Sequence, residues 1–204
     1  MDKHIITLSE QHEHLPLLRQ YFGLRKRLFI DGLRWEGPAV TFGWETDQWD
    51  TPAFDPVYVL VSNRNGQLLG GSRFIRATVP TMFETLWPER LYEPLEKTDT
   101  ILEIHRWAID PDIDRLDHQL VTLSLSYAIC DWAIDNGAKT SLMLGHKRLF
   151  DKSRHLKHLR AAGPVNDDFT IAMFGDLTPE INKVRAFKIA DLENQKSQFQ
   201  SQVA

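Results

Sequence analysis

The stretch Thr100–Asp110 reads Thr-Ile-Leu-Glu-Ile-His-Arg-Trp-Ala-Ile-Asp, the pattern of a buried β-strand interrupted by three ionisable residues. Glu103, His105 and Arg106 stand among large apolar side chains, and burying such groups is unfavourable unless each finds a partner. The stretch therefore predicts a central strand whose charges are answered by other segments. Because Glu103 and Arg106 point to opposite faces of a regular strand, we expect a β-bulge near Ile104–His105 that brings both to one side.

Length and composition favour one α/β domain spanning residues 1–204, since the 204 residues are 42% hydrophobic and 25% charged. A net charge of -4 gives no general attraction to nucleic acid or to anionic membranes. Cys130 is the single cysteine, which excludes an internal disulfide and a cysteine-based zinc site and predicts a reducing, cytoplasmic location. The beginning of the chain lacks a secretory pattern, and no segment approaches the roughly 20 apolar residues of a membrane span, so we expect no stable membrane association.

The first long segment predicts a helix from about Glu10 to Leu33, with Ser9 as a candidate N-cap. Spacings of three and four residues place one cation on the apolar stripe of this helix, which consists of Leu18, Phe22, Arg25 and Phe29. Arg25 therefore needs a carboxylate partner. The alternative is an arginine that extends past the core to solvent.

A long aromatic loop over Arg34–Pro56 follows the helix. Loops of more than about 12–15 residues are usually functional or disordered, and the aromatic content argues against disorder, so we expect this loop to fold over a ligand. Asp47 and Asp50 present two carboxylates to a cation or to Arg25, with a turn or N-cap role as the alternative. Without a third ligand they make a poor metal signature, so we expect no metal.

The middle of the chain predicts a β-hairpin, Val57–Ser62 and Leu68–Thr78, joined through Asn65-Gly66. Arg73 lies inside the apolar run of the second strand. The remaining segments predict, in order, short helical turns over Pro80–Leu95, a helix with Cys130 in its core face that ends at Asn136-Gly137, a strand over Thr140–Leu144, a helix over His146–Ala162, a strand over Phe169–Phe174 and a polar C-terminal helix or tail at about 180–204.

The predicted helix over His146–Ala162 has a strongly basic outer face. In an acidic protein such a concentration of charge favours docking of an anionic partner, with ordinary solvated side chains as the alternative. The residues that we assign to such a docking face are Lys147, Arg148, Lys152 and Arg154.

The buried charges form a balanced set drawn from four segments. The cations are Arg25, Arg73 and Arg106, and the anions are Asp47, Asp50 and Glu103. The set suits a structural network, but beside an aromatic loop it also suits a small zwitterionic ligand with a carboxylate, an ammonium group and a flat ring.

Four motifs carry a family resemblance, in order and in spacing. They are Arg25-x3-Phe29-x5-Trp35, Asp47-Gln48-Trp49-Asp50, Arg73 after Gly-Gly-Ser, and Glu103-Ile-His-Arg106-Trp107. Over roughly residues 20–175 the chain resembles the acyl-homoserine-lactone synthase (autoinducer synthase) family. It departs from the family's usual Glu-x-Ser-Arg-Phe strand by carrying His105 for Ser and Trp107 for Phe, and it lacks a proline expected near Ala77, so the detailed shape of the pocket differs.

The resemblance implies an N-acetyltransferase-like fold, a three-layer αβα sandwich with a splayed mixed central sheet that holds a phosphopantetheine arm. It implies S-adenosylmethionine as a substrate and no separate cofactor. The amine of S-adenosylmethionine would attack an acyl thioester, and its carboxylate would then displace methylthioadenosine, giving an N-acyl-L-homoserine lactone for quorum sensing.

The resemblance also implies roles for individual residues. Glu103 is the first candidate for the base that deprotonates the amine, in a catalytic set with Asp47, Asp50 and Arg106. The two aspartates would hold the sulfonium or ribose side, and Arg25, Arg73 and Arg106 would fix the substrate carboxylate and organise the acids. Aromatic walls would come from Phe29, Trp35 and Trp44. The remaining substrate-binding residues are His105 (a second proton acceptor or a hydrogen-bonded histidine), Trp107, and Leu142, Met143 and Leu144 along the acyl tunnel.

The acyl donor is either acyl carrier protein or acyl-coenzyme A, and the basic face of the predicted helix over His146–Ala162 favours the carrier. Two other functions stay open at this point. One is an N-acyltransferase that acts on a different amine, and the other is a non-catalytic acyl- or nucleotide-binding module. The sequence does not rank acyl chain lengths or 3-substituents.

Overall fold

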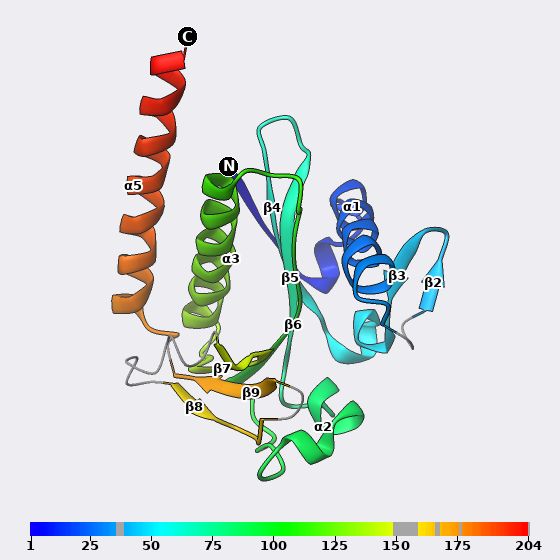
Figure 1. Ribbon diagram of the computed structural model, residues 1–204. Coiled ribbons are helices and arrows are strands. Elements are labelled where there is room, and N and C mark those ends of the chain that lie inside the picture. Colours follow the sequence, from blue (N-terminus) through cyan, green and yellow to red (C-terminus); the bar gives the residue numbers. More distant parts are fainter. Residues whose placement is uncertain (36–38, 149–158, 166–167, 176, 204) are drawn as a thin grey trace.

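The computed structural model describes residues 1–35, 39–148, 159–165, 168–175 and 177–203. Its centre is a mixed sheet in the order β1-β4-β5-β6-β7-β9-β8 (Figure 1). Within the described residues the strands of this sheet are β1 (Asp2–Ile6), β4 (Val57–Ser62), β5 (Leu68–Arg76), β6 (Ile101–Ile109), β7 (Thr140–His146), β8 (Leu159–Ala161) and β9 (Phe169–Phe174). β6 and β7 run parallel, and the other described pairs are antiparallel.

Helices cover both faces of the sheet, and short elements fill the connections. The helices described are α1 (Leu15–Arg25), α2 (Met82–Leu86), α3 (Arg115–Asp135) and α5 (Pro179–Val203). The short elements are η1 (Leu8–Glu10), η2 (Lys26–Gly32), η3 (Gln48–Asp50), η4 (Pro52–Phe54), η5 (Pro88–Arg90), β2 (Ala39–Thr41) and β3 (Trp44–Thr46). None of the helices in the described ranges combines the length and the apolar composition that crossing a bilayer requires.

β4 shows how the layers form, because its side chains alternate between the two faces of the sheet. Val59 and Val61 pack with Val121 and Leu125 of α3, whereas the neighbouring residues of β4 pack with α1. α5 lies along the outer side of α3 (Figure 1). Each large apolar side chain buried in this way contributes about 1.5–3 kcal/mol. The predicted αβα sandwich is confirmed.

The sheet splits between its two parallel strands. β6 pairs with β7 only from Ile101 to Ile104, opposite Thr140–Met143. Beyond this point β7 continues alongside β9 as far as the pair His146 and Phe169. The splayed sheet expected from the family resemblance is therefore present, and the split opens in the second half of β6.

A glycine in β5 allows α1 to lie close to the sheet. A Cβ atom at Gly71 would stand 2.7 Å from the Tyr21 ring and 2.5 Å from Leu60 Cδ2. Only a residue without a side chain leaves room for the tyrosine ring at this position. The ring passes close to Gly71, and its hydroxyl reaches β6, where it donates to the Arg106 carbonyl oxygen at 2.8 Å.

The first helix begins later than predicted. α1 starts at Leu15, because Pro16 fits the first turn of a helix, where its missing N–H is not needed. Ser9 belongs to the separate turn η1, for which Thr7 is the N-cap, so the prediction of a Ser9 N-cap is wrong. From Lys26 to Gly32 the chain continues as a π-helical segment. Helical structure therefore reaches nearly as far as predicted.

Two other predictions need correction. The segment Arg34–Pro56 is no irregular loop, since it contains the β2–β3 hairpin and two 3-10 turns. Leu159–Ala161 forms strand β8 beside β9 instead of the end of a helix, because its backbone pairs with Ala172–Phe174. The rest of that predicted helix lies largely outside the described residues. The predicted hairpin of Val57–Ser62 and Leu68–Thr78 is confirmed, with its second strand ending at Arg76, and the core position of Cys130 and the C-terminal helix are confirmed as well.

Candidate active site

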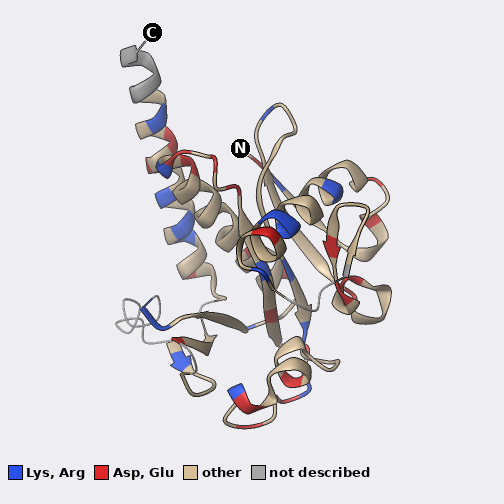
Figure 2. Cartoon of the chain, turned by 45° about the vertical axis from the view of Figure 1, so that its right-hand side comes forward, with Lys and Arg blue, Asp and Glu red and all other residues tan. Residues whose placement is uncertain are grey.

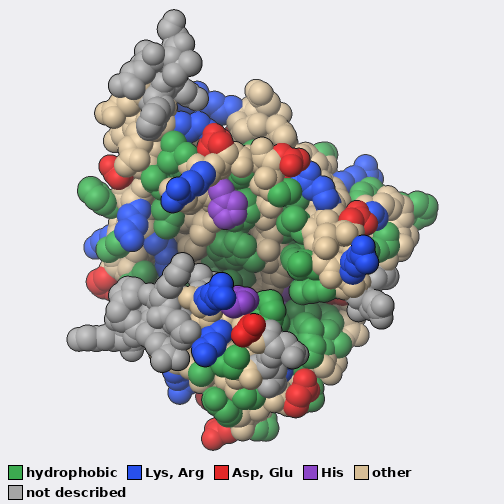
Figure 3. All heavy atoms as spheres, in the orientation of Figure 1, with side chains coloured by type: hydrophobic (Ala, Val, Ile, Leu, Met, Phe, Trp, Pro, Cys, Tyr) green, Lys and Arg blue, Asp and Glu red, His purple; other side chains and the backbone are tan. Residues whose placement is uncertain are grey.

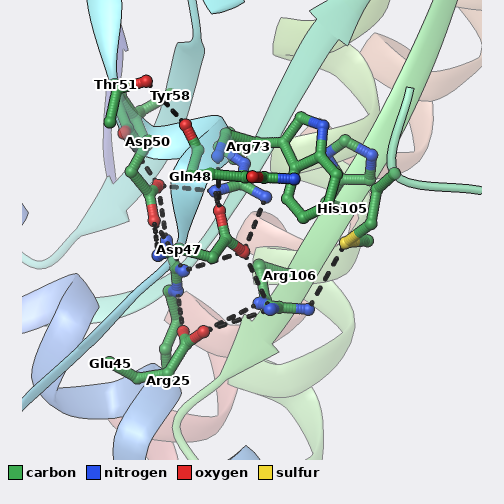
Figure 4. Close-up of polar contacts among 12 residues, drawn as sticks. Arg25, Glu45, Asp47, Gln48, Asp50, Thr51, Tyr58, Arg73, His105 and Arg106 are labelled. Atoms are coloured by element: carbon green, nitrogen blue, oxygen red, sulfur yellow. Dashed lines mark hydrogen bonds and ion pairs between the residues drawn. The ribbon is translucent and has the colours of Figure 1, made fainter. Parts of the chain in front are cut away.

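Three arginines from separate elements converge on the carboxylates of residues 45–50 (Figure 4). Arg25 ends α1, Arg73 lies in β5 and Arg106 lies in β6. Arg25 and Arg73 are completely buried, and Arg106 is 7% exposed. The predictions that these cations are buried and that Arg25 binds carboxylates are confirmed.

Asp50 connects α1 to β5. It accepts two hydrogen bonds from the Arg25 guanidinium at 2.8 and 2.9 Å, and Arg73 Nη1 lies 2.7 Å from its Oδ1. The Tyr58 hydroxyl and the Asp47 backbone N–H also donate to it, at 2.9 and 2.8 Å. Burial by itself raises the pKa of Asp50, but the charges of Arg73 and Arg25 outweigh burial and hold that pKa well below its usual range. Asp50 is therefore a carboxylate held in its charged form.

Asp47 connects β5 to β6. Arg73 donates to both of its oxygens, at 2.5 and 3.1 Å, and Arg106 donates to Oδ2 at 2.8 Å. Oδ1 also accepts the Trp49 backbone N–H at 3.0 Å, as the N-cap of η3. The two roles considered for this aspartate, a cap and an arginine partner, are thus both present.

Glu45 completes the cluster, and sequence reasoning missed it. It is fully buried in β3. Its Oε2 accepts a hydrogen bond from Nε of Arg25, and its Oε1 accepts one from Nε of Arg106 at 3.1 Å. A weak signal was available, since Glu45 and Asp47 are two residues apart and a short extended segment would place them on one face. We call these six residues the ion-pair cluster: Arg25, Glu45, Asp47, Asp50, Arg73 and Arg106.

Glu103 does not belong to the ion-pair cluster, so the predicted grouping of this anion with the arginines is wrong. Its Oε1 accepts the Phe83 backbone N–H at 3.1 Å and contacts Nε2 of His105. Both Glu103 and His105 are buried. The strand pattern correctly predicted that Glu103 needs a partner, but strand alternation does not specify which segment provides it. The partners come from α2 and from the strand itself.

The predicted bulge is present in β6, slightly further along the strand than expected. His105 pairs with Arg73 and Ala108 pairs with Gly71, so Arg106 and Trp107 together face Ser72 alone. Arg106 has a φ of 52°, in the left-handed region that few non-glycine residues adopt. The Ser72 hydroxyl donates to the His105 carbonyl oxygen at 3.0 Å and helps to fix this shape. As a result His105 and Arg106 both reach the same cavity.

That cavity has a volume of about 190 Å³, and we call it the small cavity. It lies at the split of the sheet and is bordered by Phe29, Trp35, Met82, Phe83, Trp87, Ile104, His105, Arg106, Trp107, Met143, Leu144 and Phe169. A large cavity of about 410 Å³ lies on the α3 side and shares four of these residues, Ile104, Trp107, Met143 and Leu144. Figure 3 shows a hollow bordered by hydrophobic side chains near the middle of the molecule.

Aromatic rings close one side of the small cavity. Phe29 and Trp35 are stacked with centroids 4.9 Å apart. The Arg106 guanidinium lies 5.6 Å from the Phe29 ring and 5.3 Å from the Trp35 ring, within cation–π distance. Trp44 is not part of this wall, since its ring lies under Arg19 at 5.4 Å.

The predicted acyl-tunnel residues divide into two groups. Met143 and Leu144 border both cavities. Leu142 is fully buried in a core cluster with Trp49 and Phe83 and does not border either cavity. Alternation along β7 explains the difference between Leu142 and Met143, which point to opposite faces.

The predicted docking face is only partly within the described residues. Lys147 and Arg148 are exposed directly after β7. Figure 2 shows that basic residues also lie along α5. Lys152 and Arg154 lie outside the described residues. Among the described residues, no group of three or more His, Cys, Asp or Glu side chains is arranged to hold a metal ion.

Known proteins are similar to this chain in sequence and in architecture. A family model described as "Autoinducer synthase" matches residues 9–152. An acyl-homoserine-lactone synthase of Rhizobium radiobacter is 30% identical over 183 residues, covering 85% of this chain and 84% of that protein.

Solved structures are similar in fold at lower identity. A coenzyme A-dependent acyl-homoserine lactone synthase, solved with S-adenosylmethionine and isopentyl-CoA, has a TM-score of 0.80 and 20% identity, covering 92% of this chain and 89% of that one. A candidate N-acetyltransferase from Lactobacillus plantarum has a TM-score of 0.50 and 14% identity, covering 85% of this chain and 98% of that one. The architecture is therefore similar to that of the N-acetyltransferases.

Proposed function

This chain belongs to the autoinducer synthase family, and on that basis we propose that it makes N-acyl-L-homoserine lactones from S-adenosylmethionine and an acyl thioester. The observation that carries the proposal is the position of Arg106. The bulge in β6 sets its guanidinium between the carboxylate of Asp47 and the stacked rings of Phe29 and Trp35, at the border of the small cavity. A cation held by a carboxylate and partly covered by rings suits a substrate that is itself zwitterionic.

Arg106 is the arginine that we assign to the substrate carboxylate. Its Nε and Nη2 bind Glu45 and Asp47, while the contact of its Nη1 is a weak one, 3.9 Å from the Met82 sulfur. Nη1 therefore has donor capacity for an incoming carboxylate. The stacked rings of Phe29 and Trp35 would attract the sulfonium centre, much as they attract other cations.

Arg25, Arg73 and Asp50 act behind the substrate in this proposal. Each binds buried charged partners of the ion-pair cluster, so their role is to hold Asp47 and Arg106 in place rather than to touch the reacting atoms. Asp47 remains the aspartate closest to a substrate in this arrangement, since it binds Arg106 directly. Rigid support of this kind preserves the orientation on which the reaction depends.

Two bond-forming steps follow from this arrangement. The substrate amine loses a proton and attacks the thioester carbonyl, so that an amide forms and the carbon–sulfur bond of the donor breaks. The methionyl carboxylate then displaces methylthioadenosine and closes the lactone. The thioester arm would enter at the split between β6 and β7, and the acyl chain would occupy the large cavity, whose lining is mainly apolar.

We further propose acyl carrier protein as the donor, supported by the exposed Lys147 and Arg148 directly after β7, one of the two strands that border the split. A carrier that docks through charges associates more slowly as salt screens them, whereas a small acyl-coenzyme A depends less on surface cations. Activity with the carrier that survives a tenfold increase in salt would count against this choice. The cytoplasmic location predicted from the sequence stays a prediction.

Titration calorimetry with S-adenosylmethionine tests the proposed site directly. We expect the wild-type chain to bind S-adenosylmethionine and Arg106→Lys to bind it at least about tenfold more weakly, because lysine cannot reproduce the planar contacts of the guanidinium. Arg64→Lys, in the exposed turn after β4, is the matched control and should bind like wild type. Lack of binding by the wild-type chain would favour an N-acyltransferase that uses another amine.

A further inference from the structure

Glu103 and His105 form a buried pair at the edge of the small cavity. They are two residues apart in β6, and Glu103 Oε1 contacts Nε2 of the His105 ring. The same oxygen accepts the Phe83 backbone N–H at 3.1 Å. The Phe83 ring also meets the His105 ring edge-on, with centroids 5.9 Å apart. The imidazole is therefore held in one orientation by α2 and by its own strand.

The contact with Glu103 assigns the tautomer of His105. Because Glu103 Oε1 acts as an acceptor, Nε2 of His105 carries the hydrogen and donates it. Nδ1 then has a free lone pair. Among the described residues this Nδ1 atom is buried and has no hydrogen-bond partner. A buried acceptor without a partner is unfavourable unless a ligand supplies a donor.

Only one member of the pair reaches the place where a substrate would lie. His105 borders the small cavity together with Arg106, whereas the cavity lining does not include Glu103. Arg106 is the group to which we assign the substrate carboxylate, and in an α-amino acid the amine is bonded to the carbon next to that carboxylate. The amine would thus lie within the same small cavity as His105.

The charges around His105 come from three elements. They are Glu103 and Arg106 on its own strand, Arg73 opposite it on β5, and Asp47 at the start of η3, while α2 presents the uncharged Met82 and Phe83. Burial lowers the pKa of His105, and the Glu103 carboxylate opposes that effect without reversing it. A neutral imidazole at pH 7 is able to accept a proton.

From this geometry we propose that His105 is a catalytic residue whose Nδ1 atom takes the proton from the substrate amine, and that Glu103 is a positioning residue that acts through His105. The inference rests on the proposed function and specifies its proton transfer. It also differs from the expectation that Glu103 itself is the base.

One N–H bond of the substrate ammonium breaks and its proton moves to His105 Nδ1, giving an imidazolium that the Glu103 carboxylate stabilises. The freed amine attacks the thioester carbon, the N–C bond forms and the C–S bond breaks. The second proton lost by the nitrogen ends on the departing sulfur as a thiol, and His105 returns its proton to solvent.

His105→Gln tests the proposal, because the glutamine amide can still donate to Glu103 but offers no basic atom. With the thioester that the wild-type chain uses fastest, we expect the acyl-transfer rate to fall about 100- to 10,000-fold. The acidic limb of the pH profile of kcat/KM should vanish, while the affinity for S-adenosylmethionine changes little. His118→Gln, an exposed histidine on α3, is the matched control. A His105→Gln enzyme with a wild-type rate and acidic limb would overturn the proposal.

Glu103→Gln separates the two residues. Since the Glu103 charge raises the pKa of His105, its removal should move the acidic limb to lower pH without abolishing it. If Glu103→Gln abolished the limb and His105→Gln kept it, Glu103 would be the base and the proposal would be wrong. Nitrogen NMR of the free wild-type protein gives a readout that needs no turnover. At pH 7 we expect a neutral His105 with hydrogen on Nε2, and a charged ring or hydrogen on Nδ1 would contradict the assignment.

Discussion

The ion-pair cluster remains charged inside the protein because its individual side chains bind several opposite charges. Each of its carboxylates contacts at least two guanidiniums, so no charge in it depends on one partner. Burying ions is costly, and their mutual attraction offsets that cost only when geometry and hydrogen bonds are good. Loss of any one member would leave the remaining buried charges less fully compensated, so we expect every such loss to destabilise the fold.

Glu45→Gln is the sharpest test of this point. The variant removes one of the carboxylate partners of both Arg25 and Arg106 and turns an amide N–H toward a cation, so we expect the free energy of unfolding to fall by about 3–5 kcal/mol. Urea denaturation at pH 7 measures it. Glu13→Gln, at an exposed position, is the control and should change stability little. A Glu45→Gln protein as stable as wild type would show that Glu45 is not a member of a coupled network.

The lowered pKa of Asp50 makes the free energy of unfolding depend on pH. Its pKa is lower in the folded protein than in the unfolded chain, so ionised Asp50 stabilises the fold above its ordinary pKa of about 3.9. That stabilisation is lost as the pH falls below this value toward the folded pKa. Urea denaturation between pH 6 and pH 3 should show the beginning of this loss.

Asp50→Asn should be less stable than wild type at pH 6 and should lose less stability on acidification. Asp55→Asn is the matched control, because Asp55 is exposed and its left-handed backbone suits asparagine equally well. If the unfolding free energies of Asp50→Asn and wild type fell equally with pH, protonation of Asp50 would not contribute to the pH dependence of stability.

Among the elements, β6 organises the site, because its bulge places consecutive side chains on the cavity side. Two hydrogen bonds fix the backbone there, one from Ser72 to the His105 carbonyl and one from Tyr21 to the Arg106 carbonyl. Tyr21 belongs to α1, so the bulge is held from a different layer of the fold. The approach of α1 depends in turn on Gly71.

Tyr21→Phe removes one of those two hydrogen bonds and leaves a buried carbonyl oxygen with a lost partner. We expect a loss of about 1–3 kcal/mol in unfolding free energy and weaker S-adenosylmethionine binding, since Arg106 is no longer held firmly. Denaturation and calorimetry on the same protein measure the two effects. Tyr92→Phe, at a tyrosine that is 65% exposed, is the control. Unchanged binding by Tyr21→Phe would show that the bulge does not need this anchor.

The sequence predicted the elements of the site better than their pairing. The strand and helix patterns identified Arg25, Arg73 and Arg106 as buried cations, because an apolar run leaves a charged side chain little choice of environment. Glu45 was missed because the segment around it has no periodicity long enough to separate buried from exposed positions. The bulge was expected near Ile104–His105, but its position depends on contacts with Tyr21 and Ser72, which are distant in sequence.

Across the fold, long-range pairing explains what sequence patterns did not predict. β8 was expected to be helical because Leu156 and Leu159 have helical spacing, yet Leu159–Ala161 pairs with β9. Strand partners of this kind depend on the whole sheet rather than on local propensity. A splayed sheet, by contrast, was expected from the resemblance to a known family, and the structure has it as the split between β6 and β7.

The layers, the split sheet and the ion-pair cluster together support one reaction, in which a single substrate molecule is acylated and then cyclised. The cyclisation step distinguishes the proposed activity from simple N-acylation. In N-acylation of another amine, a thiol and an amide form but the sulfonium substrate is not cleaved. The two activities therefore differ in the fate of S-adenosylmethionine.

The most direct test is incubation of the purified chain with S-adenosylmethionine and a panel of acyl-carrier-protein and acyl-coenzyme A donors, followed by mass spectrometry of the products. We predict that an N-acyl-homoserine lactone and methylthioadenosine form in equal amounts with at least one donor. Absence of methylthioadenosine with every donor, or an acylated amine formed without it, would contradict the proposed function.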